Sequence, residues 1–187
     1  MTRCLLLLMV LWMGAPVGTA RAAVPVARVV VGEILAADSV RTHTLELMAR
    51  GQVQEAIDYW VLSTGQEAPK WLLAAKLAFD ASKQVMGACQ GVARTLYTAF
   101  TQMGGRPELM ELRTQAVRGA RFIHFRMLNG KDMMLTDNGY HLLVRMNGRA
   151  YDAYTGPAGM LWAEYTSRLS AHLEIQQAMV NAAEVFP

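Results

Sequence analysis

Cys89, His141 and Asp152 together supply the side chains that nucleophilic catalysis requires. When a carboxylate holds one nitrogen of an imidazole, the other nitrogen is free to take a proton from a nucleophile. A cysteine thiol becomes that nucleophile once it loses its proton. In this scheme Cys89 attacks a carbonyl carbon, His141 moves the proton, and Asp152 orients His141. Gln84 and backbone N–H groups beside Cys89 would stabilise the resulting oxyanion.

The segment HLLVRMNGRAYD has the types and spacing to bring the imidazole and the carboxylate together. Asn147-Gly148 lies at its centre, and an Asn-Gly pair between alternating segments predicts a β-hairpin with a two-residue turn. Its expected strand pairing extends as far as His141 opposite Tyr154. Side chains alternate between the faces of a strand, so His141 and Asp152 are expected on one face as diagonal neighbours.

The nucleophile is expected at the start of a helix. In CQGVARTLYTAFTQM the apolar residues recur at helical spacing from Val92 to Met103, and Cys89 lies one turn before them. Gly104-Gly105 is expected to end this helix. A helix N-terminus stabilises a thiolate, and a neighbouring imidazolium stabilises it further.

Each of the three residues also has a simpler interpretation, which the residues alone leave open. Cys89 could be a small buried apolar residue, His141 a hydrogen-bonded sheet residue, and Asp152 a solvated hairpin residue. His124, on another expected strand, is a rival partner for Cys89, but no carboxylate is placed to orient its ring. The four histidines show no metal-ligand spacing, so we expect neither a metal ion nor a cofactor.

The first 22 residues have the composition of a secretory signal peptide. Arg3 precedes an apolar run from Cys4 to Met13, and Ala20-Arg21-Ala22 fits the small-x-small pattern of a cleavage site. The alternative is a retained membrane anchor, but the run is shorter than the about 20 apolar residues that span a bilayer. We therefore expect a secreted or periplasmic protein with no stable membrane anchor after cleavage.

Cleavage would change both the charge and the cysteine count. The chain has 18 basic and 15 acidic residues, a formal net charge of +3, and loss of Arg3 and Arg21 lowers it to +1. So small a charge gives no reason to expect nucleic acid as a partner. Cys4 would leave as well, and a lone Cys89 in a secreted chain indicates an intermolecular bridge or a reactive thiol.

The expected elements come in the order helices first and strands second, which is typical of an α+β fold. Apolar residues recur at helical spacing from Arg41 to about Phe100. Residues 24–35 are expected to form a short strand or an extended lead-in, residues 120–128 a half-buried strand, and residues 131–138 a loop. A final amphipathic helix is expected from Leu161 to Ala183.

The segments CQGVARTLYTAF and GYHLLVRMNGRAYDAYTGPAGMLW resemble the papain-fold toxin domains of bacterial polymorphic toxin systems. Those domains have a cysteine that begins a helix, a strand that begins with histidine, a short glycine turn, an aromatic-Asp pair, and a Pro/Gly segment before a tryptophan. The resemblance extends from about Val85 to Leu169. The matching residues are Cys89, His141, Gly148, Tyr151-Asp152, Pro157, Gly159 and Trp162.

This resemblance implies a papain-like core in which the nucleophile helix packs on a small antiparallel sheet. The chain would then consist of a signal peptide (1–22), an N-terminal helical region (23–84) and a papain-like catalytic domain (85–187). The implied function is a secreted cysteine hydrolase that acts on an amide bond as a peptidase, amidase or deamidase, with a toxin or effector role. Its implied partners are a protein or peptide substrate and an immunity protein.

Two other functions remain open. A transglutaminase-like acyltransferase would use the same three residues but pass the acyl group to an amine instead of water. A secreted binding or structural protein would keep the fold with an inactive site. The N-terminal helices could cover the cleft, as a built-in inhibitor or as a substrate-binding subdomain.

Overall fold

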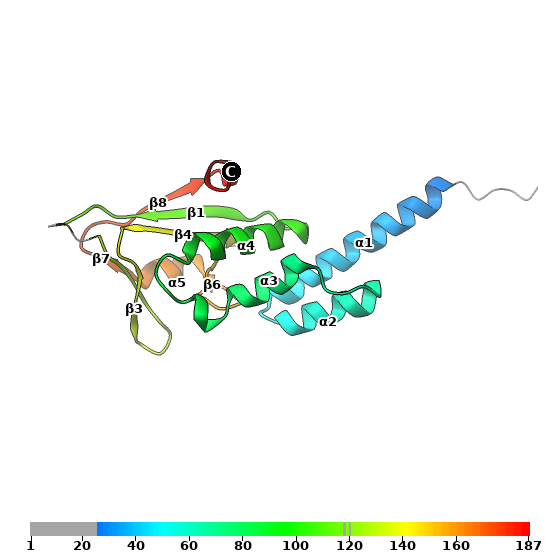
Figure 1. The fold of residues 1–187 in the computed structure, drawn as a ribbon, viewed down its shortest axis with the longest axis horizontal. Helices are drawn as coiled ribbons and strands as arrows, with labels where there is room; N and C mark the ends of the chain where they lie inside the picture. Colours follow the sequence, from blue (N-terminus) through cyan, green and yellow to red (C-terminus); the bar gives the residue numbers. More distant parts are fainter. Residues whose placement is uncertain (1–25, 118, 120) are drawn as a thin grey trace, which may run out of the picture.

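Helices form the N-terminal part of the described chain, and antiparallel strands with two short helices follow (Figure 1). The computed structural model describes residues 26–187 except 118 and 120. The predicted signal peptide, residues 1–22, lies outside these residues. The order of the elements confirms the predicted α+β class. Within the described part, no helix is both long and apolar enough to cross a bilayer.

The N-terminal helices are α1 (Val26–Ala49), α2 (Val53–Thr64) and α3 (Lys70–Ala78). α1 packs against α2 and projects away from the sheets (Figure 1). The strand or extended lead-in predicted for residues 24–35 is wrong from residue 26 onward, where α1 begins. Helix propensity is a weak preference of tenths of a kcal/mol per residue, so a valine run can continue into a longer helix.

The helix that begins with the cysteine is α4 (Cys89–Gln102), and its predicted start and end are confirmed. Gly87, with a φ of 81°, precedes it, and Gly104-Gly105 follows it. α4 packs against β4 on one side and α3 on the other. Its buried stripe consists of Val92, Ala93, Leu96, Ala99 and Phe100.

The larger sheet has five strands in the order β6-β5-β4-β1-β8, and all neighbours are antiparallel. α4 lies along this sheet (Figure 1). The strands are β6 (Met160–Leu161), β5 (Arg149–Tyr151), β4 (Tyr140–Met146), β1 (Glu108–Arg113) and β8 (Gln176–Val180).

The smaller sheet has three antiparallel strands in the order β3-β2-β7. β2 (Ile123–Arg126) confirms the strand predicted within residues 120–128, and β7 is Leu169–Ala171. β3 (Asp132–Thr136) shows that the predicted loop at 131–138 is wrong. This edge strand buries only its last two residues, so its sequence lacks the alternating apolar pattern of a half-buried strand.

The predicted helix from Leu161 to Ala183 is also wrong. The chain there forms the short helix α5 (Trp162–Ser167), then β7 and β8, and ends in α6 (Ala182–Val185). β7 pairs with β2 and β8 pairs with β1, both distant in the sequence. Local periodicity cannot reveal such non-local pairing, which here overrides the helical pattern.

One buried apolar cluster joins the helices to the larger sheet. Met48 of α1 and Leu72 of α3 belong to it, together with Leu96 of α4 and Leu142 of β4. The N-terminal helices therefore share a core with the region that carries Cys89 and His141, and they support the position of α4.

Candidate active site

The hairpin between β4 and β5 turns where the sequence predicts. Asn147 and Gly148 have φ values of 51° and 72°, as a two-residue hairpin turn requires, and Met146 pairs with Arg149. The ladder stops at Tyr151, however, so the predicted strand pairing farther from the turn is wrong. Beyond Tyr151 the backbone leaves the sheet in a turn, which its own hydrogen bonds stabilise.

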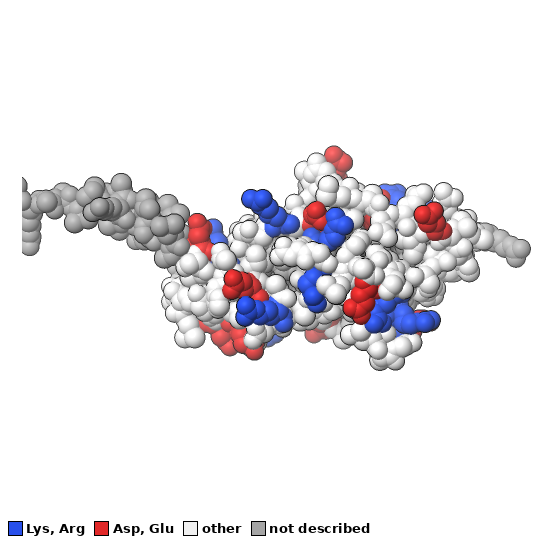
Figure 2. All heavy atoms as spheres, turned by 180° about the vertical axis from the view of Figure 1, so that it is seen from behind, with Lys and Arg blue, Asp and Glu red and all other residues white. Residues whose placement is uncertain are grey.

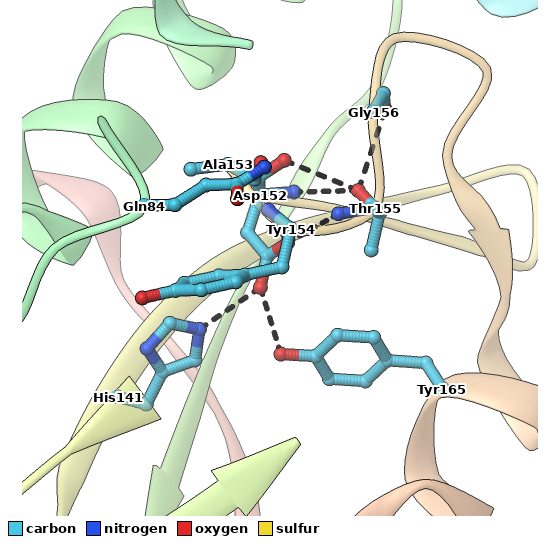
Figure 3. A network of polar contacts seen from close by, with 8 residues as sticks. All are labelled: Gln84, His141, Asp152, Ala153, Tyr154, Thr155, Gly156 and Tyr165. Carbon is cyan, nitrogen blue, oxygen red and sulfur yellow. Dashed lines mark hydrogen bonds and ion pairs between the residues drawn. The ribbon is translucent and has the colours of Figure 1, made fainter. Parts of the chain in front are cut away.

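This turn places Asp152 against His141. Nε2 of His141 lies 3.1 Å from Oδ2 of Asp152, and both side chains are almost fully buried. The hydroxyl of Tyr165 donates to the same oxygen at 2.8 Å, as Figure 3 shows. The backbone N–H groups of Tyr154 and Thr155 donate to Oδ1 at 2.8 and 2.9 Å. The carboxylate is therefore held in one orientation by four hydrogen bonds.

These contacts keep Asp152 ionised although it is buried. Burial by itself would raise the pKa of Asp152, but the hydrogen bond and charge of His141 outweigh it, and Tyr165 adds to their effect. The net result is a lowered pKa. A charged, fully bonded carboxylate at this position fixes which nitrogen of His141 faces it.

Tyr165 is a functional residue that the sequence does not reveal. It comes from α5, which the sequence predicts as the first part of a long helix, and it is fully buried. Its hydroxyl reaches Asp152 only because α5 packs beside β5 and β6. No spacing or motif in the sequence indicates that contact.

Cys89 is the first residue of α4 and remains partly exposed. The N-cap residue Ala88 supplies no side-chain hydrogen bond to this helix end, which leaves its first N–H groups to other acceptors. Burial would raise the pKa of the Cys89 thiol, but the nearby imidazole of His141 lowers it. Hydrogen bonds from the backbone of Leu142 and Gln90 lower it further, so the net pKa is lowered.

The second ring nitrogen of His141, Nδ1, is the one that is not bonded to Asp152. Nδ1 is buried and forms no hydrogen bond of normal geometry, although Cys89 is close enough for the two groups to shift each other's pKa. Burial would lower the pKa of His141, but Asp152 and Cys89 raise it to about 9. Because the two pKa values shift in opposite directions, the pair is stabilised as a thiolate and an imidazolium.

Gln84, the predicted side-chain donor to the oxyanion, contacts the backbone segment that follows Asp152. It follows the short 3₁₀ turn Ala81–Lys83, and its Nε2 donates to the carbonyl oxygen of Ala153 at 3.0 Å (Figure 3). One N–H of this amide is therefore engaged in holding the segment after Asp152.

His124, the rival partner, lies on β2 in the smaller sheet. Its ring lies near that of Phe122, and the two line a separate hollow together with His172. The structure therefore separates His124 from the cavity that contains Cys89. Among the described residues, no three His, Cys, Asp or Glu side chains are grouped so that they could hold a metal ion.

Cys89 lines two hollows, and a third lies next to them. A small cavity is lined by Cys89, His141, Asp152, Tyr154 and the apolar Val92 and Leu135. A polar pocket is lined by Cys89, Gln90, Thr136, Asp137, Asn138 and Tyr140. A groove between α3 and α4, with a volume of about 410 Å³, shares Val92 with the small cavity and Gly87 with the polar pocket.

Charges of both signs are interspersed on the face of the molecule that Figure 2 shows. The full chain carries a formal charge of only +3. A surface of this kind does not concentrate ligands of one charge by long-range steering.

No family model matches this chain, and no curated protein or solved structure is significantly similar to it.

Proposed function

We propose that this protein is a secreted cysteine hydrolase with a papain-like core that cleaves an amide bond in a protein or peptide. One observation carries the proposal. A partly exposed thiol with a lowered pKa, at the start of a helix, lies beside a buried histidine that a buried carboxylate holds. The nucleophile helix packs on an antiparallel sheet, which is the arrangement that the resemblance to papain-fold toxin domains implies.

The residues account for each step of amide hydrolysis. The Cys89 thiolate attacks the carbonyl carbon, and the electron pair of the C=O bond moves to oxygen. The C–N bond then breaks while Nδ1 of the His141 imidazolium gives its proton to the leaving nitrogen. Water, deprotonated by the neutral imidazole, attacks the thioester and releases the acid. Asp152 holds Nε2 throughout, so Nδ1 is the nitrogen that moves the proton.

A non-catalytic binding protein would gain little from this arrangement. Burying an ionised pair costs several kcal/mol per ion through lost hydration, and apolar residues of similar size fill a core at lower cost. Groups whose pKa values are shifted by burial and by specific partners concentrate at functional sites. The Cys89, His141 and Asp152 cluster has both features.

The groove between α3 and α4 supports a polypeptide substrate. Its volume of about 410 Å³ lies in the range of ligand sites, about 300–1,000 Å³. Small and apolar residues line most of it, so it fits an apolar side chain of a peptide whose reacting carbonyl lies at Cys89. The lining includes Ala74, Leu77, Ala78, Ala88, Gly91 and Val92.

The activity can be tested with a peptide library and mass spectrometry. We expect wild-type protein to produce cleaved or deamidated peptides, and Cys89→Ala to produce none. An added alkylamine that appears in the products would indicate acyl transfer instead of hydrolysis. Identical peptide profiles for wild type and Cys89→Ala would refute the proposal.

The groove has its own test at Gly91. A Cβ at this helical position meets no atom within 4 Å, so Gly91→Leu fills the groove without disturbing the core. We expect KM for the peptide substrate to rise about tenfold, since even one methylene in an apolar pocket contributes ~1–3 kcal/mol of discrimination. Gly91→Ala is the matched control, because it adds only a methyl group. Equal KM values for both variants would place the substrate elsewhere.

A toxin or effector role is part of the proposal through the resemblance alone. Such a protein would be neutralised by an immunity protein, and a protein that binds over Cys89 would block the polar pocket that this residue lines.

A further inference from the structure

Two buried side-chain polar atoms in the described part of the chain have no hydrogen-bond partner: Nδ1 of His141 and the hydroxyl of Tyr154. Nδ1 already has a role as the atom that moves the proton. Tyr154 is only 8% exposed, so water does not solvate its hydroxyl from outside. A buried hydroxyl without a partner is costly, and proteins seldom keep one unless it serves a purpose.

Tyr154 lines the small cavity that Cys89 also lines. Cys89, His141 and Tyr154 all line this cavity, which Val92 and Leu135 close with apolar side chains. In Figure 3 the phenol of Tyr154 lies on the same side of Asp152 as the His141 ring, away from Tyr165. An apolar wall strengthens any hydrogen bond made inside such a cavity.

Hydrogen bonds hold the backbone around Tyr154, and its side chain is almost fully buried. Its N–H donates to Asp152 at 2.8 Å, and the carbonyl of the preceding Ala153 accepts from Gln84 at 3.0 Å. Thr155 donates its N–H to Asp152 as well, at 2.9 Å. Gln84 therefore positions the segment that carries the phenol.

The phenol is a donor at neutral pH. Burial raises the pKa of Tyr154, and the negative charges of Asp152 and Cys89 raise it further, so the hydroxyl keeps its proton. Other side-chain donors near Asp152 already have acceptors: Tyr165 donates to the carboxylate, Thr155 to the carbonyl of Asp152, and one N–H of Gln84 to Ala153.

We propose that the Tyr154 hydroxyl donates a hydrogen bond to the carbonyl oxygen of the substrate and stabilises it as an oxyanion. This role rests on the proposed amide hydrolysis. When sulfur bonds to the carbonyl carbon, the C=O electron pair moves to oxygen and Tyr154 binds that oxygen without transferring its proton. The pair returns to form C=O when the C–N bond breaks, and the imidazolium proton goes to the leaving nitrogen.

The test compares two reactions of the same thiol. Acylation by p-nitrophenyl acetate passes through an oxyanion, whereas alkylation by iodoacetamide does not. In Tyr154→Phe we expect acylation to slow by about 100-fold, the usual loss of one oxyanion donor, with alkylation unchanged. Tyr97→Phe is the matched control, because this tyrosine lies on the same helix as Cys89 but lines a hollow beside β1 and β8.

Two results would overturn the proposal. Equal acylation rates for Tyr154→Phe and wild type would show that the hydroxyl does not contact the oxyanion. An equal loss in both reactions would show that it acts on the thiolate. Failure of the proposed function is a separate result: wild-type acylation would then be unaffected by His141→Ala. The denaturation midpoint of Tyr154→Phe, expected to be equal to or higher than that of wild type because the costly unpartnered hydroxyl is gone, verifies that a loss of acylation is not a loss of folding.

Discussion

Each of the two sheets has a histidine on an inner strand and an aspartate near it, and their surroundings differ sharply. His141 of the larger sheet and Asp152, in the turn that follows β5, have side chains that are 1% and 2% exposed and are bonded to each other. In the smaller sheet, His124 is half-buried against Phe122, and Asp132 pairs with Arg126 at the surface, 53% exposed. The same residue types thus form a coupled buried pair in one sheet and separate surface contacts in the other.

The difference lies in what converges on each histidine. β4 is an inner strand covered by α4, so a residue on it can meet a thiol from α4 and a carboxylate from the turn after β5. β2 is also an inner strand, but the part of its sheet around His124 opens to a hollow lined by ring and hydroxyl side chains. Strong coupling therefore arises from burial by neighbouring elements and cannot be inferred from a histidine on a strand.

The largest expected contrast is in catalysis. In the proposed mechanism His141 moves the proton, so in His141→Ala acylation of Cys89 by p-nitrophenyl acetate should fall about 10²–10⁴-fold. His124→Ala should leave the rate unchanged, because its ring is outside the cavity that holds the thiol. Stopped-flow absorbance measures both. Equal losses of acylation rate in the two variants would mean that His141 has no special role at the thiol.

The aspartates should differ in their effect on stability. Asp152→Ala leaves a buried imidazolium and the hydroxyl of Tyr165 without their partner, which should lower the free energy of unfolding by about 3–5 kcal/mol. Asp132→Ala breaks an exposed pair with Arg126 and should cost about 0–1 kcal/mol. Urea denaturation followed by circular dichroism measures both. A small loss for Asp152→Ala would mean that the pair is less strongly coupled than the structure indicates.

The sequence predicts those features of the site that depend on local contacts and misses those that depend on contacts between distant residues. The Asn-Gly turn and the helix start at Cys89 are local signals, and both predictions are confirmed. The contacts of Tyr165 and Gln84 with the segment around Asp152 join residues brought close by folding, and no spacing predicts them. The unpartnered hydroxyl of Tyr154 is visible only when every neighbour is placed.

The fold shows the same limit. Strand β2 alternates apolar and polar residues and was predictable, whereas β3 and β8 are edge strands that bury little of their surface. The apolar spacing of residues 161–183 fits a helix locally, but pairing of β7 with β2 and of β8 with β1 decides otherwise. Edge strands take their structure from a partner that the local pattern does not contain.

The pair of Cys89 and His141 also predicts how pH affects stability and the alkylation of the thiol. The pKa of His141 is about 9 when folded and 6.5 by itself, so its contribution to stability is lost as pH rises through about 9. The lowered pKa of Cys89 acts in the opposite direction, because its contribution grows as pH rises toward the ordinary thiol value of 9.0.

Between these limits the folded protein holds an imidazolium and a thiolate where the unfolded chain holds an imidazole and a thiol. The number of bound protons is then the same, so wherever Cys89 is already a thiolate the site should not change stability with pH, up to about pH 9. The rate of alkylation of Cys89 by iodoacetamide should still reveal the thiolate and imidazolium pair. Its rate should rise at a lower pH than for an ordinary thiol, and His141→Ala should move the rise upward. An unmoved alkylation profile would mean that His141 does not stabilise the thiolate.

The smallest contrast concerns the turns. Gly148 joins β4 to β5 with a φ of 72°, and Gly130 lies between β2 and β3 with a φ of 80°. A Cβ at either position meets no atom within 4 Å, so valine is penalised mainly by the left-handed backbone, by about 1–2 kcal/mol in each case. Thermal denaturation should show similar losses for both variants.

Activity should separate the two valine variants. β5 leads directly to Asp152, so strain at Gly148 shifts the carboxylate relative to His141, whereas strain at Gly130 affects only the smaller sheet. We expect acylation to slow several-fold in Gly148→Val and to be unchanged in Gly130→Val, at a temperature where both are folded. If acylation is unchanged in both, the hydrogen bonds from Tyr165 and Thr155 position Asp152 by themselves, and the hairpin turn serves the fold alone.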